Sequence, residues 1–239
     1  MRTVKAPAFD PRARLKVRAT GFWSTDWSLT VLLIILVGNI FVLPLTEFAT
    51  WGRVAARSVL SLVIISGVIA TLDDRGFLAL VVVLSLGSVL VGWENVKRPN
   101  LYFHLCNDLF SLLFVGFLAG LILRQVLRPG PITSRRVQGS VAVYLLLGLL
   151  WAIWYELIEF LAPGSFGPLR HSGAASLPEL AYFSYTTLTT LGLGPIVPMR
   201  PLARSLVILE GLVGQLFPVI LIAGLVTMEI DHRNRSRQV

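Results

Sequence analysis

Six long stretches of this chain are almost entirely apolar, and they constrain its fold more than any other feature. Of the 239 residues, 55% are hydrophobic and only 14% are charged. A water-soluble domain needs more charge than this to cover its core, whereas about 20 apolar residues in a helix cross the hydrocarbon layer of a bilayer. The stretches are therefore predicted to be transmembrane helices, at about 28–46, 55–72, 77–93, 103–123, 138–161 and 201–227.

The basic residues indicate how these helices are oriented. Residues 1–27 are basic and contain no apolar run, so they are predicted to be a cytoplasmic tail and not a cleavable signal sequence. With 129–137 as a cytoplasmic linker and 231–239 as a cytoplasmic C-terminal tail, about two thirds of the Lys and Arg residues lie inside, as the positive-inside rule requires. The predicted location is the cell membrane, where the basic segments could also bind anionic lipids.

Other classes of function leave signs that this sequence lacks. The formal charge of +8 is not accompanied by a soluble domain that could present it to nucleic acid. There is no His-rich metal motif and no Gly-x-Ser-x-Gly, so the chain is predicted not to be an enzyme. Cys106 is the single cysteine, which rules out an intramolecular disulfide.

Residues 28–128 are predicted to form a four-helix transmembrane domain. Its fourth helix, 103–123, has no arginine at every third position, so it lacks the charges that a voltage sensor moves through the membrane field. Asp108 is the acidic candidate for burial in this domain, with Asn39, His104 and Asn107 as candidate partners. Two interpretations stay open: a proton or ligand sensor, or an acid that reaches the interface or pairs with a polar neighbour.

A shorter apolar segment, 177–189, separates the last two long stretches. Ser176, Pro178 and Glu179 have the spacing of a helix N-terminus with a capping box. At 1.5 Å per residue this helix would be about 20 Å long, so it would reach the middle of the membrane but would not cross it. Non-helical backbone at that depth is tolerated only where protein buries it or where it lines a water-filled cavity.

Residues 190–194 are predicted to be such a backbone. Gly192 and Gly194 alternate with larger residues, and glycine adopts backbone angles that other residues avoid. Successive carbonyl groups could then turn to one side and form a ladder of oxygens.

Residues 181–194, with the sequence Ala-Tyr-Phe-Ser-Tyr-Thr-Thr-Leu-Thr-Thr-Leu-Gly-Leu-Gly, resemble the pore helix and selectivity filter of potassium channels. Thr190-Leu191-Gly192-Leu193-Gly194 stands where that family has Thr-Val-Gly-Tyr-Gly. The resemblance covers about 100 residues, from the fifth apolar stretch to the C-terminus. It also places Gly214 at the position of the hinge glycine of the family's inner helix.

The resemblance implies an all-α integral membrane protein with six transmembrane helices, a re-entrant pore helix and a filter. The pore domain would comprise residues 138–230, with outer helix 138–161, pore helix 177–189, filter 190–194 and inner helix 201–227. Four copies would form a homotetramer and conduct potassium ions, with no other cofactor. The ions would bind at Thr190, Leu191, Gly192 and Leu193, with Gly194 completing the filter.

Several positions differ from the family pattern. Leu193 replaces the filter tyrosine, and Pro195 replaces the aspartate that follows the second glycine. Tyr182 and Phe183 stand where the family commonly has tryptophans, so an apolar surround is predicted in place of a polar one. Weaker potassium preference is expected, and the alternatives of a weakly selective cation channel or a non-conducting scaffold with a channel fold stay open.

Further residues are predicted to support the filter or to move the inner helix. Thr186, with Tyr182, Phe183 and Pro195, is expected to support the filter. Glu156 and Glu159, near the outer end of 138–161, could each replace a missing anchor of the filter. A helix end in solvent is the alternative for both, and it is the preferred interpretation for Glu159. Gly214 and Pro218 are candidate hinge residues, although close packing explains the glycine equally well.

Overall fold

The computed structural model describes residues 25–46, 58, 61–66, 75–97, 101–128, 133–168 and 176–236, which are mostly helical. The helices are α2 (Thr25–Thr46), α4 (Arg75–Lys97), α5 (Leu101–Val126), α6 (Ser134–Leu161), α7 (Leu177–Leu188) and α8 (Pro201–Ser236). Two short strands, β1 (Phe166–Gly167) and β2 (Val197–Pro198), pair antiparallel. The predicted helical fold agrees with this architecture, apart from the strand pair.

Three of the described helices are long and apolar enough to cross a membrane: α5, α6 and α8 as far as Thr227. Two shorter apolar stretches, Leu29–Phe41 and Ala79–Glu94, lie within α2 and α4. Most of the span predicted at 55–72 lies outside the described residues. The described part of the chain therefore agrees with a helical membrane protein, and the count of six spans stays a prediction.

Several helices extend beyond their predicted ends. The helix α8 continues to Ser236 although the span was predicted to end at 227, so it includes most of the predicted C-terminal tail. The helix α6 begins at Ser134, inside the predicted linker 129–137. Hydropathy locates the apolar part of a helix, but helical hydrogen bonding continues through polar residues until something ends it.

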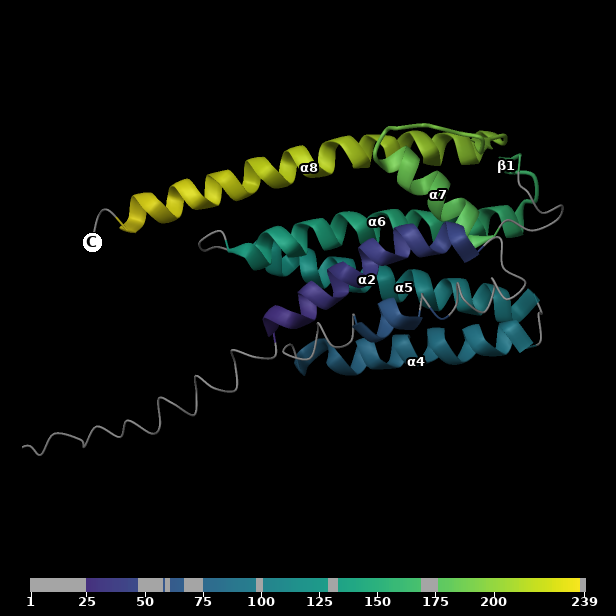
Figure 1. Ribbon diagram of the computed structural model, residues 1–239, viewed down its shortest axis with the longest axis horizontal. Coiled ribbons are helices and arrows are strands. Elements are labelled where there is room, and N and C mark those ends of the chain that lie inside the picture. The colour runs from purple at the N-terminus through teal and green to yellow at the C-terminus, as the bar shows by residue number, and fades with distance from the viewer. Residues whose placement is uncertain are drawn as a thin grey trace, which may run out of the picture.

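The helices pack in an order that brings the C-terminal half together (Figure 1). The helix α5 packs against both α4 and α6, and α2 packs against α6. The short helix α7 lies between α6 and α8 and also contacts α2. Buried apolar residues fill the region between α2, α5 and α6; they include Leu32, Leu36, Phe114, Leu118, Leu146 and Leu149.

Two glycines let α7 come close to its neighbours. A β-carbon at Gly148 of α6 would collide with the ring of Tyr185. A β-carbon at Gly214 of α8 would collide with the backbone carbonyl of Leu188, at the end of α7. Small residues allow such close approach between helices in membranes. Gly214 thus has a packing role, and the structure shows α8 as one helix through both candidate hinge positions.

Replacing Gly214 with alanine tests this packing. Because the added methyl group meets a backbone carbonyl that cannot swing aside, Gly214→Ala should lower the free energy of unfolding by about 1–3 kcal/mol. Thermal unfolding of the detergent-solubilised protein would measure the change. Gly224→Ala in the same helix is the matched control, since the space around Gly224 is open. A variant as stable as the wild type would contradict the packing role of Gly214 and leave the predicted hinge as the alternative.

Candidate functional site

The helix α7 begins with the predicted capping box. The Glu179 carboxylate accepts hydrogen bonds from the backbone N–H of Ser176 at 3.2 Å and from its hydroxyl at 3.0 Å. Glu179 is buried, and Pro178 lies in the first turn, where its missing N–H has no cost. The N-terminus predicted from these three residues is confirmed.

The other end of α7 stops within the protein, and its carbonyl groups find partners there. The Tyr144 hydroxyl of α6 donates to the Leu188 carbonyl at 3.0 Å. The Thr186 carbonyl accepts from the backbone N–H groups of Leu191 at 2.8 Å and Gly192 at 3.1 Å. Helix ends leave such carbonyls without intrahelical partners, and here α6 and the following loop supply them.

The loop after α7 has an alternating backbone. Thr190, Gly192 and Gly194 have φ values of 60°, 57° and 68°, whereas Leu191 and Leu193 between them have no positive φ. Alternation of left-handed and ordinary backbone angles turns successive carbonyl groups to the same side. The positive φ predicted for the two glycines is confirmed, and Thr190 adds a third position, at which a non-glycine residue is uncommon.

The carbonyl oxygens of this loop differ in their partners. The Gly194 carbonyl accepts a hydrogen bond from the Tyr182 hydroxyl of α7 at 2.9 Å. Within the described structure, the carbonyls of residues 190–193 accept no hydrogen bond. Four successive oxygens are therefore available to a ligand, and the fifth accepts a hydrogen bond from α7.

Three aromatic rings pack behind the loop. Phe183 of α7 contacts Tyr155 of α6 and Phe166 of β1, with ring centroids 5.6 Å and 5.5 Å away. Tyr155 and Phe166 are 4.9 Å apart. The predicted apolar surround is thus present at Phe183, whereas Tyr182 departs from it by donating a polar contact to the loop.

Comparison with known proteins bears on the same region. A family model described as "Ion channel" matches residues 142–230, which contain most of α6, α7, the loop and most of α8. The inward rectifier potassium channel Kirbac3.1 of Paramagnetospirillum magnetotacticum is 36% identical over 78 residues, 31% of this chain and 23% of the relative.

The family model over residues 142–230 and the match to Kirbac3.1 support a relation to the potassium channel superfamily. The chain spans about a quarter of the length of its curated relative. No solved structure matches the chain significantly. The matches point to a channel and not to an enzyme.

The predicted filter residues occupy one continuous loop between α7 and β2. The side chains of Leu191 and Leu193 are 63% and 68% exposed, and Pro195 is also exposed. Thr186 contacts the loop through its backbone carbonyl. Glu156 is buried on α6, and its role as an anchor of the filter stays a prediction.

Glu159 corrects a prediction, because it is buried and does not lie in solvent. Its carboxylate accepts hydrogen bonds from the backbone N–H groups of Gly164 at 2.7 Å and Phe166 at 2.9 Å. These bonds hold β1, which pairs with β2 just after the filter loop. The segment after α6 therefore folds back over the end of that helix and shields Glu159 from water.

Glu210 was missed by the sequence analysis. It lies in α8 and is 0% exposed, and its carboxyl group contacts the hydroxyls of Tyr155 and Ser184. A signal for it was present, since an acidic residue in the middle of an apolar span is a functional hypothesis by default.

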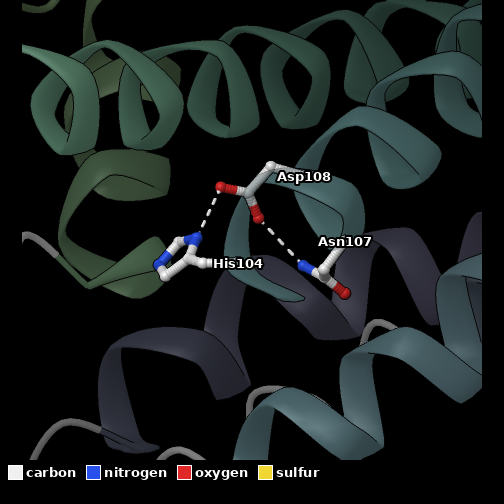
Figure 2. A network of polar contacts seen from close by, with 3 residues as sticks. All are labelled: His104, Asn107 and Asp108. Carbon is white, nitrogen blue, oxygen red and sulfur yellow. Dashed lines mark hydrogen bonds and ion pairs between the residues drawn. The ribbon is translucent and has the colours of Figure 1, made fainter. Parts of the chain in front are cut away.

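Asp108 of α5 pairs with two of its three candidate partners (Figure 2). Its Oδ1 accepts a hydrogen bond from the Asn107 side chain at 2.8 Å, and its Oδ2 lies 2.9 Å from the His104 ring. The His104 ring stacks on Phe160 of α6, with centroids 4.3 Å apart. Asn39 is buried on α2 but forms no hydrogen bond with Asp108 in the described structure. The polar contacts of Asp108 therefore lie within α5, and the His104 ring joins α5 to the end of α6 by stacking on Phe160.

Tyr182→Phe tests the contact between α7 and the loop. Removal of one hydrogen bond should lower stability by about 0.5–1.5 kcal/mol. If the loop is the filter that the sequence predicts, release of the Gly194 carbonyl should also reduce the preference for potassium over sodium. Thermal unfolding and ion flux in liposomes measure the two effects. Tyr102→Phe is the control, since Tyr102 is 73% exposed. If both variants behave like the wild type, the Tyr182 contact does not hold the loop in place.

Proposed function

We propose that this chain is one subunit of a tetrameric cation channel that conducts potassium. The observation that carries the proposal is the alternating backbone at 190–194, which leaves four successive carbonyl oxygens without protein partners. Rings of such oxygens replace the water shell of a potassium ion in selectivity filters. In the tetramer, ions bind at Thr190, Leu191, Gly192 and Leu193.

Exposed apolar surface supports the assembly of four copies. Only 17% of the most apolar window of α8 is buried within one chain. Its exposed side chains include Ile208, Leu209, Leu212, Leu216, Val219, Ile220, Ile222 and Val226. Leu191 and Leu193 are also exposed on the filter loop. One loop supplies one side of a pore, so neighbouring copies complete the pore and cover part of this surface.

The direction of α7 supports a cation as the permeating ion. Its C-terminal end, which carries partial negative charge, lies next to the filter loop. Tyr182 gives the loop one polar anchor, but Leu193 and Pro195 supply neither hydroxyl nor carboxylate. We therefore propose potassium conduction with weaker discrimination against sodium than a filter with all three anchors.

The proposal also covers the predicted four-helix domain, the two termini and the basic segments. The predicted four-helix domain, 28–128, has no row of arginines in α5, whose last turn carries Arg124, so strong voltage gating is not proposed. Both termini lie on the cytoplasmic side of the cell membrane. The basic tail and linker contact anionic lipids.

Ion flux in liposomes tests the proposed function. The purified protein should pass potassium faster than sodium down equal gradients, and Thr190→Ala should reduce this preference because it removes a hydroxyl from the filter. Liposomes without protein are one control. A large organic cation is the other, and it should not pass through the protein. Absence of flux for both ions would indicate a non-conducting scaffold, and equal flux for both would contradict potassium selectivity.

A further inference from the structure

Glu210 joins three helices behind the filter. Its Oε2 lies 2.6 Å from the Tyr155 hydroxyl of α6, and its Oε1 lies 2.5 Å from the Ser184 hydroxyl of α7. Ser184 also lies 2.8 Å from the Gly148 carbonyl of α6. The carboxyl group thus connects α8 to the outer helix and to the pore helix at one point.

The hydrogens available at this point determine how the contacts are made. Ser184 has one hydroxyl hydrogen but lies within hydrogen-bond distance of two oxygens. If Glu210 were ionised, one of those contacts would bring two acceptors together without a hydrogen. If Glu210 carries a proton on Oε1, it donates to Ser184, Ser184 donates to Gly148, and Tyr155 donates to Oε2. Each contact then has one hydrogen.

The surroundings of Glu210 favour the same state. An ionised carboxylate removed from water is costly unless it is paired with a cation. Glu210 forms no ion pair in the part of the chain that the structure describes, and it is fully buried. The titratable groups that face it from α6 are Tyr155 and Tyr144, and α7 presents the uncharged Ser184.

We propose that Glu210 is a positioning residue for the selectivity filter. In its protonated form it holds α7 in place between α6 and α8. The effect reaches the filter through α7. Tyr155 packs on Phe183, which adjoins Ser184, and the neighbouring Tyr182 holds the Gly194 carbonyl. This inference rests on the proposed function for its effect on ion preference, but not for the state of the carboxyl group.

Variants of Glu210 separate this role from simple packing. Glutamine has an N–H that donates to Ser184 and a carbonyl that accepts from Tyr155, so Glu210→Gln should keep the potassium-to-sodium flux ratio of the wild type. Glu210→Ala and Ser184→Ala should lower that ratio several-fold in correctly assembled protein. Ser205→Ala is the control in α8, because the Ser205 hydroxyl bonds only within its own helix. If Glu210→Gln loses the ratio as fully as Glu210→Ala, the proposal is wrong.

Infrared spectroscopy tests the proton directly and does not require conduction. The difference spectrum between wild type and Glu210→Gln, in a detergent without carbonyl groups, should show the C=O stretch of a neutral carboxylic acid. Carboxylate bands in its place would overturn the proposal even if Glu210→Ala does not fold. If the wild type conducts no ions but shows the acid band, the proposed function fails and the assignment of the protonated acid stands.

Discussion

The structure of this channel domain depends on how a helix that ends inside the protein satisfies its last carbonyl groups. In lipid no water is available for them, so each must find a donor in the protein. The Leu188 carbonyl accepts a hydrogen bond from the Tyr144 hydroxyl, and the Thr186 carbonyl accepts from the backbone N–H groups of Leu191 and Gly192. Close contact between α7, α6 and α8 is required for this, and Gly148 and Gly214 make it sterically possible.

The filter loop follows from the same constraint. The N–H groups of Leu191 and Gly192 turn back to Thr186, which leaves the carbonyls on the other side of the loop. Positive φ angles at alternate residues maintain that arrangement over five positions. Beyond the loop, the β1–β2 pair and the buried Glu159 fix the return of the chain to α8.

Features encoded by local residue pattern could be predicted from the sequence. The start of α7 was predictable because Ser176, Pro178 and Glu179 have a spacing that specifies a helix N-terminus. The positive φ at Gly192 and Gly194 was predictable because glycine favours it. Thr190 gave no such signal, since its backbone angle is imposed by the hydrogen bonds around it.

Contacts between distant parts of the chain could not be predicted in the same way. The burial of Glu159 depends on the loop folding back over the end of α6, which the pattern of apolar residues does not specify. Glu210 meets Tyr155 and Ser184 only because three helices converge. Helix bounds were missed for a simpler reason: α8 continues through polar residues up to Ser236, where hydropathy no longer identifies it.

Leu193 and Pro195 lack the hydroxyl and the carboxylate that the potassium channel pattern has at these positions. Other contacts hold this part of the chain. The Tyr182 hydroxyl holds the Gly194 carbonyl, and the rings of Phe183, Tyr155 and Phe166 pack together between α7, α6 and β1. We propose that four copies of residues 190–194 surround one axis and bind potassium. A structure of the protein determined in potassium should show a fourfold assembly with ion density between rings of carbonyl oxygens from Thr190 to Leu193. An assembly in which these loops face lipid, or enclose no ion, would rule out this arrangement.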